Sequence, residues 1–295
     1  LHVVAAQWWE RDKGTEQIEG FKSLRDEFTS DLVDASSIKI MQDGVLENYT
    51  AAMLEPYLEA NGTKGIPMID PELLKKAVAE LDADGFQVHI HAIGDAAIHQ
   101  SLDAIEYARK QNGPLGHRHH IAHLQVIHPD DIPRFAALDV VANFQPYWAA
   151  ADEYIMELNV PAIGEERTSW MYPIRSIEKT GATIAFGSDW SVSTANPFLE
   201  IETAVTRLGA LGEPYPEFTP NERISLQTAI DAFTINAAFV NKQEDKTGSI
   251  EVGKLADLVV LNQNMFEIDP AQISDTKVLL TLFGGKAVYG VPDGL

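Results

Sequence analysis

Histidines concentrate in two short stretches of the chain. Eight of the nine lie between His89 and His128, most of them in FQVHIHAIGDAAIHQ (86–100) and HRHHIAHLQ (117–125). Each group follows or lies within an apolar run typical of a strand, and Asp189 follows a third such run, 182–186. The carboxyl ends of parallel strands meet at one edge of a sheet, where α/β enzymes bind their ligands. Two histidines and an aspartate on three strand ends predict a metal site, and with it a hydrolase.

His89 and His91 are two residues apart, so they share one face of a strand. His91 lies nearer the strand end and is the better candidate ligand, whereas His89 would lie about 6–7 Å deeper. The alternative is that both are hydrogen-bonded core residues, which is the usual role of an isolated strand histidine. Gly94 permits a tight turn after the strand, and Asp95 is placed to cap the following helix or to take part in the site.

The second histidine group belongs to the next strand. Strand alternation puts His119 and His123 on one face and His120 on the other. His123 is the last histidine before the predicted strand end, which makes it the natural ligand. We expect His117 and His120 to face solvent or to lie behind the ligands, and His128 to lie on a surface loop.

Asp189 and Lys39 extend the candidate site. Asp189 follows a Gly-Ser turn at a strand end, where it either caps a helix or ligates a metal and handles the proton of the attacking water. Lys39 lies in the middle of the strand SIKIM (37–41), so it points away from its apolar neighbours. It is placed to be carboxylated and bridge two metals, to pair with Asp43, or simply to reach the surface. Imidazole and carboxylate ligands suit Zn²⁺, with Mn, Fe or Co as alternatives.

The composition limits the class of protein. The 295 residues carry 22 basic and 44 acidic side chains, a formal net charge of −22 at pH 7. This acidic balance argues against binding to nucleic acid and against attraction to anionic membranes. The chain has no cysteine, which excludes disulfides, thiolate ligands and cysteine nucleophiles. No run reaches the ~18 apolar residues of a membrane span.

Predicted strands and helices alternate along most of the chain. We expect strands at 1–7, 37–41, 86–91, 119–123, 140–144 and 182–186, and helices at 13–30, 70–83, 95–112, 128–138, 172–180, 197–211 and 222–240. Such alternation predicts an α/β fold with a parallel sheet, and six units favour a (β/α)8 TIM-type barrel over a doubly wound sheet. The long segment 44–68 is expected to be a lid or binding loop.

From Thr247 the sequence becomes rich in turns and strand-forming residues, and GG at 284–285 joins two short apolar runs. We predict a barrel domain over residues 1–246 and a small β module over 247–295. The chain opens directly in the apolar run LHVVAAQ, without an initiator Met. We therefore expect it to begin inside a domain, and the count of six units, two short of eight, agrees with a chain that starts late.

At these residues the chain resembles the amidohydrolase superfamily, in the branch of amidohydrolase family 3 that includes N-substituted formamide deformylase. The matching stretches are IKIMQDG (38–44), HAIGDAAI (91–98), RHHIAHLQ (118–125), FGSDWSV (186–192), GSIEVGKLADLVVLNQNMFE (248–267) and LLTLFGGKAVYG (279–290). The resemblance implies a (β/α)8 barrel, a β-sandwich built from both chain ends, and one or two divalent metals, foremost Zn²⁺. It implies His91, His123 and Asp189 as metal ligands, Asp189 also as the catalytic base, and Lys39 at the position that some relatives use as a carboxylated ligand.

The chain also departs from the family pattern. The His-x-His motif expected on strand 1 is not in this sequence, because the AIGD that follows His89-Ile90-His91 marks that segment as strand 5. We therefore expect the chain to lack the N-terminal third of the family, including strands 1 and 2 of the barrel. Ala122 stands where relatives often carry Glu, and Ser191 where they often carry Pro.

Together these features predict a metal-dependent hydrolase of carbon–nitrogen bonds other than peptide bonds, of the amide, formamide or cyclic amide type, acting through metal-activated water. His119, Tyr147 and Trp148 are assigned to the substrate pocket. The alternative is a catalytically inactive barrel that acts as a binding or regulatory protein. The expected partners are a small-molecule substrate and a second copy of the chain, with no nucleic acid and no membrane. The compartment stays open between the cytoplasm and export, since a signal peptide would lie upstream of residue 1.

Overall fold

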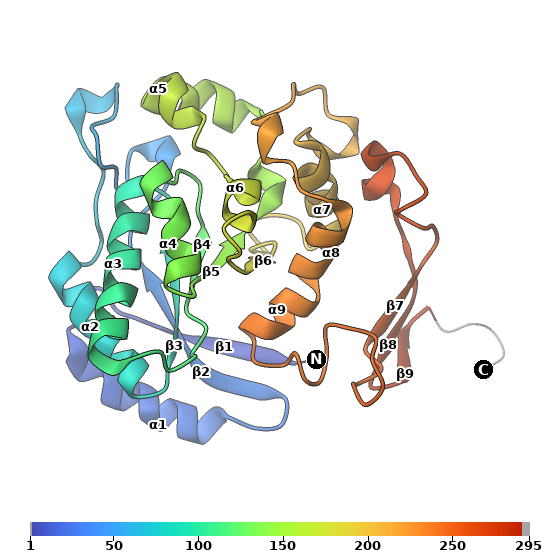
Figure 1. Ribbon diagram of the computed structural model, residues 1–295, viewed down its shortest axis with the longest axis horizontal. Helices are drawn as coiled ribbons and strands as arrows, with labels where there is room; N and C mark the ends of the chain where they lie inside the picture. The colour runs from blue at the N-terminus through green and yellow to red at the C-terminus, as the bar shows by residue number, and fades with distance from the viewer. Residues whose placement is uncertain (1, 291–295) are drawn as a thin grey trace. The chain divides into compact units, whose positions relative to one another are not determined.

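The structure is a computed structural model that describes residues 2–290 (Figure 1). The chain divides into two compact units. The first comprises Leu1–Phe144 and Glu153–Ile184, and the second comprises Gln145–Asp152 and Ala185–Leu295. The predicted boundary between residues 246 and 247 does not coincide with this division and stays a prediction.

Parallel strands form the centre of the first unit. They are β1 (Val3–Trp8), β2 (Val33–Met41), β3 (Gln87–Ala92), β4 (His120–His123) and β5 (Val141–Phe144). A sixth strand, β6 (Ile184–Phe186), is the one in which the chain passes into the second unit. β1 to β5 pair in parallel and in sequence order, and β6 follows β5 in the same sheet. The predicted α/β fold with a parallel sheet is confirmed. Over the described residues the sheet is open, since its order begins at β1 and ends at β6.

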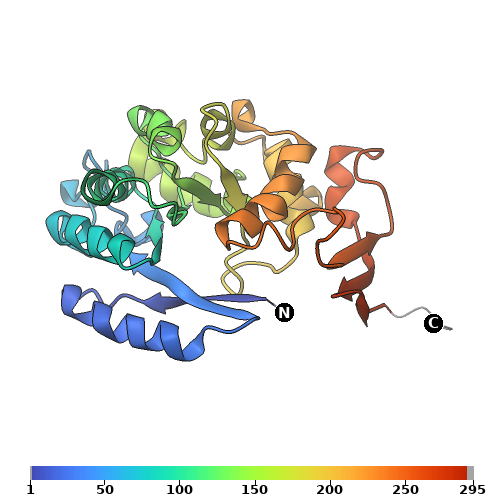
Figure 2. The ribbon, with the colours of Figure 1, turned by 60° about the horizontal axis from the view of Figure 1, so that its bottom comes forward.

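Helices separate these strands along the chain. They are α1 (Ile18–Phe28), α2 (Pro71–Ala83), α3 (Asp95–Asn112), α4 (Ile132–Ala137), α5 (Val160–Thr168) and α6 (Ile174–Glu178). α2 and α3 lie side by side (Figure 1), and α1 runs along the ribbons of β1 and β2 (Figure 2). All were predicted except α5 and the π-helical turn before it, Tyr154–Asn159. The sequence VPAIGEERT has no clear helical period, and Gly164 interrupts α5 with a φ of 81°.

The two faces of the sheet differ in chemistry. One face consists of side chains with no exposed surface: Ile38, Ile40, Val88, Ile90 and Ile121. This is the helix side, because His119, two residues before Ile121, reaches Asp82 of α2. The alternate positions on the same strands carry polar side chains: Lys39, His89, His91 and His120. These residues form the polar face of the sheet.

Acidic residues at two helix starts have different roles. Asp70 caps α2 as predicted, since its carboxylate accepts hydrogen bonds from two backbone N–H groups of the first turn at 3.0 and 3.1 Å. Asp95 does not cap α3. It is the first residue of that helix, Gly94 is the N-cap, and Asp95 Oδ1 accepts a hydrogen bond from Leu54 N at 2.8 Å. Asp95 therefore ties the start of α3 to the 44–68 segment.

The described part of the second unit holds helices and a small antiparallel sheet. The elements are α7 (Pro197–Thr206), α8 (Leu226–Phe233), α9 (Ile235–Val240), β7 (Leu258–Leu261), β8 (Val278–Phe283) and β9 (Lys286–Tyr289). The helix predicted at 197–211 ends earlier, because Arg207 has a φ of 60°. The helix predicted at 222–240 is divided at Thr234, whose φ and ψ are −118° and −92°.

The order β7-β8-β9 confirms part of the predicted β module. Gly284 and Gly285 make its hairpin with φ values of 55° and 78°, which favour glycine. Residue 1 of the first predicted strand and residues 291–295 of the predicted module lie outside the described residues. None of the described helices combines the length and apolar character needed to cross a bilayer.

Candidate functional site

Three polar side chains line up across neighbouring strands on the polar face. Lys39 of β2, His89 of β3 and His120 of β4 occupy opposite positions in the strand register. Lys39 Nζ lies 3.2 Å from His89 Nε2, and the ring centroids of His89 and His120 are 4.2 Å apart. Both ring nitrogens of His120 are buried without a hydrogen-bond partner among the described residues. We call Lys39, His89 and His120 the lower row.

Burial keeps the histidines of the lower row neutral. Removal from water lowers the pKa of His89 well below its ordinary value, and the nearby His120 and Lys39 act in the same direction. The pKa of His120 falls to about 3, again mainly through burial. A neutral imidazole keeps a lone pair that can accept a hydrogen bond or bind a metal.

A second pair of histidines lies nearer the carboxyl ends of the strands. The ring centroids of His91 in β3 and His123 in β4 are 4.5 Å apart, with an angle of 62° between the rings. His91 Nε2 lies 3.0 Å from Gly44 O. In the neutral ring this nitrogen donates its proton to the carbonyl, and Nδ1 keeps the lone pair. Burial lowers the pKa of His91 to about 4. We call His91 and His123 the upper row.

Asp43 connects the upper row to the surrounding backbone. Its carboxylate is fully buried and accepts hydrogen bonds from Ala52 N, Ile93 N and Gly94 N at 2.9, 3.0 and 2.9 Å. Burial raises the pKa of Asp43 to about 7, although the three N–H donors act in the opposite direction. Asp43 Oδ1 also lies 3.5 Å from His91 Nε2, and because His91 is neutral at pH 7 this contact is not an ion pair.

The 44–68 segment approaches the end of β3 closely at Gly94. Ala96 N donates a hydrogen bond to Ala52 O at 3.0 Å, and a Cβ atom at Gly94 would collide with the same carbonyl oxygen. Position 94 of the HAIGD stretch therefore has no room for a side chain, and only glycine fits there. The segment is fixed against the strand end that carries His91.

In the second group His119 and His120 follow strand alternation, and His123 departs from it. His119, assigned to the substrate pocket, is fully buried on the helix side, with Nε2 2.9 Å from Asp82 Oδ1. This placement does not support a contact with substrate. His120, expected to face solvent or to lie behind the ligands, is buried in the lower row. His123 reaches His91 because its backbone has a left-handed φ of 78°, which ends the alternation at the last residue of β4.

The other predicted site residues belong to the second unit. Asp189 is exposed just after β6 and has a left-handed φ of 52°. Tyr147 and Trp148 lie in a short 3-10 turn beside α7, and both are half-buried. That these three side chains join the histidine rows stays a prediction.

Glu200 of α7 is a buried carboxyl group that the sequence did not indicate. Its Oε2 accepts a hydrogen bond from Tyr147 N at 3.4 Å, while Oε1 has no hydrogen-bond partner among the described residues. Burial raises the pKa of Glu200 to about 8, and the charge of Asp189 acts in the same direction. An acidic residue in the first turn of a helix is ordinary, so no sequence signal distinguishes this one.

The chemistry of the histidine rows fits a divalent metal. Neutral imidazole nitrogens are good ligands for Zn²⁺, and both nitrogens of His120 lack a hydrogen bond. Within residues 2–290, no group of three or more His, Cys, Asp or Glu side chains is arranged to hold a metal ion. The rows therefore fit part of a coordination sphere, which further ligands would have to complete.

Comparison with known proteins identifies the family. Residues 2–289 match family 3 of the amidohydrolases, described as the amidohydrolase family. The chain belongs to this family. The amidohydrolase resemblance of the histidine, lysine and Gly-Ser-Asp stretches is thereby confirmed.

Several relatives span most of the chain. The protein LONG AFTER FAR-RED 3 of Arabidopsis thaliana is 35% identical over 255 residues, which are 85% of this chain and 42% of the relative. The putative amidohydrolase YtcJ of Bacillus subtilis strain 168 is 31% identical over 258 residues, 87% of this chain and 47% of the relative. N-substituted formamide deformylase of Arthrobacter pascens is 29% identical over 209 residues, 70% of this chain and 37% of the relative.

A solved structure agrees with these sequence matches. An uncharacterized metal-dependent hydrolase from Pyrococcus horikoshii OT3 has a TM-score of 0.76 and 26% identity, over 92% of this chain and 52% of that one. The present chain spans less than half the length of each of the three curated relatives.

Proposed function

We propose that the protein is a metal-dependent hydrolase that cleaves carbon–nitrogen bonds other than peptide bonds, of the amide, formamide or cyclic amide type. Membership in the amidohydrolase family supports the hydrolase class. Relatives named as a formamide deformylase and as a metal-dependent hydrolase support the type of bond and the need for a metal. In the proposed whole protein the sheet closes into a (β/α)8 barrel, with the polar face turned inward.

The observation that carries this proposal is the pair of histidine rows at the carboxyl ends of parallel strands. His91 and His123 would hold a divalent metal, foremost Zn²⁺, with Asp189 as a further ligand and Lys39 beside a second ion. His91 is prepared for this role, because Gly44 O accepts a hydrogen bond from its Nε2–H and Nδ1 keeps the lone pair that can ligate. A bound divalent metal lowers the pKa of water and polarises the substrate carbonyl.

The remaining residues would move protons and shape the pocket. Asp189 is proposed to accept a proton from the attacking water and to deliver it to the leaving nitrogen. Tyr147 and Trp148 would contact the substrate together with the 44–68 segment. Asp43 would act as a positioning residue, because its three hydrogen bonds hold the end of β3 and the segment that faces it.

Hydrolysis of a panel of N-substituted formamides, amides and cyclic amides tests the proposal in the protein expressed from its complete gene. We expect amine release that requires a divalent metal and that falls by about 100-fold or more in His91→Ala and in Asp189→Asn. His99→Ala removes a histidine outside both rows and should retain the wild-type rate. Wild-type activity in His91→Ala or Asp189→Asn would contradict the assignment.

A second candidate is a non-catalytic barrel that binds a ligand or regulates a partner. It is favoured by one observation, that the described residues contain no complete group of metal-binding side chains. This candidate predicts no hydrolysis of any compound in the panel and less than about 0.2 metal ions per chain.

A further inference from the structure

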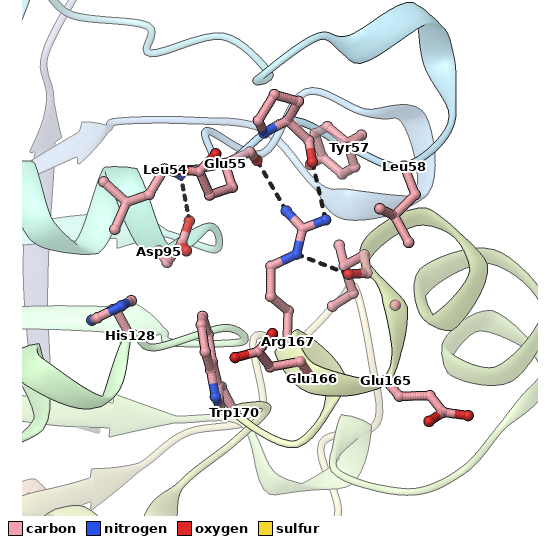
Figure 3. Close-up of a pocket in the computed structure, with 13 residues that line it drawn as sticks. Leu54, Glu55, Tyr57, Leu58, Asp95, His128, Glu165, Glu166, Arg167 and Trp170 are labelled. Carbon is pink, nitrogen blue, oxygen red and sulfur yellow. Dashed lines mark hydrogen bonds between the residues drawn. The ribbon is translucent and has the colours of Figure 1, made fainter.

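The first unit contains a cavity that does not include the histidine rows. It has a volume of about 980 Å³ and lies between the 54–58 stretch, the start of α3 and the 163–170 stretch (Figure 3). A cavity of this size can hold a small organic molecule. None of the residues assigned above to metal binding or catalysis lines it.

The lining of this cavity is acidic and partly aromatic. Asp95 forms part of the wall, and Glu55, Glu165 and Glu166 lie at exposed positions of the lining. Figure 3 shows Asp95, His128 and Trp170 next to one another along one side. The rings of His128 and Trp170 meet edge to face, with centroids 5.1 Å apart at an angle of 74°. An aromatic face beside carboxylates attracts cations and repels anions.

Asp95 is the most constrained of these carboxylates. The residue is only 1% exposed, and Oδ1 accepts a hydrogen bond from Leu54 N at 2.8 Å. Burial raises the pKa of Asp95 above its ordinary value. The surroundings of the charged carboxylate therefore do not fully replace the water that it has lost. A cationic group placed in the cavity would stabilise the charged carboxylate.

Arg167 does not make the cavity an anion site. Its Nε, Nη1 and Nη2 donate hydrogen bonds to the carbonyl oxygens of Ile163, Glu55 and Pro56 at 2.8, 2.9 and 3.0 Å. Figure 3 shows the guanidinium turned toward these backbone oxygens. The single guanidinium of the lining is therefore engaged in fixing the wall.

The cavity is preformed, because the hydrogen bonds of Arg167 and Asp95 already hold its walls in place. Arg167 joins the 55–56 backbone to α5, and Asp95 joins Leu54 to the start of α3. A ligand that enters does not have to order these segments, so less free energy is lost on binding.

We propose that this cavity binds a small organic ammonium compound, with the cationic nitrogen at Asp95 and the apolar part against Trp170. The compound is a primary amine attached to an aromatic or aliphatic group. Its lining residues are distinct from the histidine rows, and the 54–58 stretch belongs to the 44–68 segment. The site is therefore tested by direct binding and not by hydrolysis.

Benzylamine, which is cationic at neutral pH, is the probe for this site, with neutral benzyl alcohol and anionic benzoate as matched compounds. Isothermal titration calorimetry should show saturable binding of one benzylamine per chain, at least about tenfold tighter than benzyl alcohol, and no binding of benzoate. The indole N–H resonance of Trp170, assigned with Trp170→Phe, should shift on addition of benzylamine. Equal affinity for benzylamine and benzyl alcohol, tighter binding of benzoate, or an unmoved Trp170 resonance would overturn the proposal.

Two variants that each remove one negative charge distinguish a contact at Asp95 from a general attraction of benzylamine to the acidic chain. Asp95→Asn keeps an oxygen that can accept from Leu54 N but loses the charge, and it should weaken benzylamine binding by at least about tenfold. Glu27→Gln removes one exposed charge on α1 and should leave the affinity within about twofold of wild type. Unchanged affinity in a folded Asp95→Asn would reject the site. If Asp95→Asn does not fold, Trp170→Leu takes its place, and unchanged affinity in that variant would reject the site equally.

Discussion

At the residue scale, burial sets the charge of the polar groups in both units. The pKa values of His91 and His120 fall to about 4 and about 3, so both rings are neutral at pH 7. The pKa values of Asp43 and Glu200 rise to about 7 and about 8, because a buried carboxylate loses its contact with water. The same cause makes the imidazoles available as ligands and the carboxyl groups weaker acids.

Replacing Asp43 with Asn should destabilise the fold by about 1–3 kcal/mol. The carboxylate accepts hydrogen bonds from three backbone N–H groups on its two oxygens. The amide has only one oxygen, so its NH₂ group must face at least one of these N–H groups. Urea unfolding measures the change. Asp12→Asn is the control, because the Asp12 side chain is 93% exposed. Equal unfolding free energies in the two variants would show that Asp43 does not hold the backbone around it.

Glu200 should make stability fall as the pH rises. Its folded pKa of about 8 lies above the ordinary 4.5, so the folded state binds the proton more tightly. This advantage is complete below about pH 4.5 and is lost by about pH 8. Glu200→Gln removes the titration, so between these two pH values the variant should gain on the order of 4 kcal/mol relative to wild type. Unfolding free energies at both pH values measure this difference, and parallel pH profiles would rule it out.

His91 could be predicted at this scale because its signal is local. The spacing from His89 and the AIGD that follows place it at a strand end. His119 and His120 could not be assigned in the same way. The left-handed φ of His123 reverses the expected faces at the strand end, and the contact of His119 with Asp82 depends on how α2 packs against the sheet.

At the scale of elements, a buried hydrogen-bond network joins α2, α3 and β3 behind the histidine rows. Asp82 Oδ1 lies 2.9 Å from His119 Nε2, and Asp82 Oδ2 accepts a hydrogen bond from Asn112 Nδ2 at 2.8 Å. His119 Nδ1 accepts a hydrogen bond from Val88 N at 3.1 Å, so the neutral ring carries its proton on Nε2. These bonds fix the helices to the strands that carry the rows.

Asp82→Ala should lower the free energy of unfolding by about 2–4 kcal/mol, because it leaves His119 and Asn112 without their buried acceptor. Chemical denaturation measures the loss. Glu80→Ala on the same helix is the control, since the Glu80 side chain is 42% exposed and its contact with Lys76 is a surface ion pair. A loss in Asp82→Ala no larger than in Glu80→Ala would argue against the network.

Elements with strong local signals were predicted well, and those decided by packing were not. α2 has its cap in the sequence, Asp70 followed by proline, and its bounds match the prediction closely. The division between α8 and α9 has no such signal. Gly248 packs against it, and a Cβ atom there would lie 2.7 Å from Ala238 Cβ and 2.9 Å from Ile235 Cα. This contact comes from the segment that follows α9, and it depends on how that segment folds back against the helices.

At the scale of the whole molecule, the regular alternation of strands and helices was enough to predict a parallel sheet. The family followed from short stretches distributed along the chain, and residues 2–289 match it. The arrangement of the lower row was beyond the sequence, because it joins Lys39, His89 and His120 through strand register.

The metal content of the purified protein, expressed from its complete gene and measured by elemental analysis, tests the central claim most directly. We predict about one or two divalent ions per chain in the wild type and less than about 0.2 in the double variant His91→Ala/His123→Ala. His99→Ala should keep the wild-type content. Equal metal in the double variant and the wild type, or less than about 0.2 ions per chain in the wild type itself, would contradict a metal site on the histidine rows.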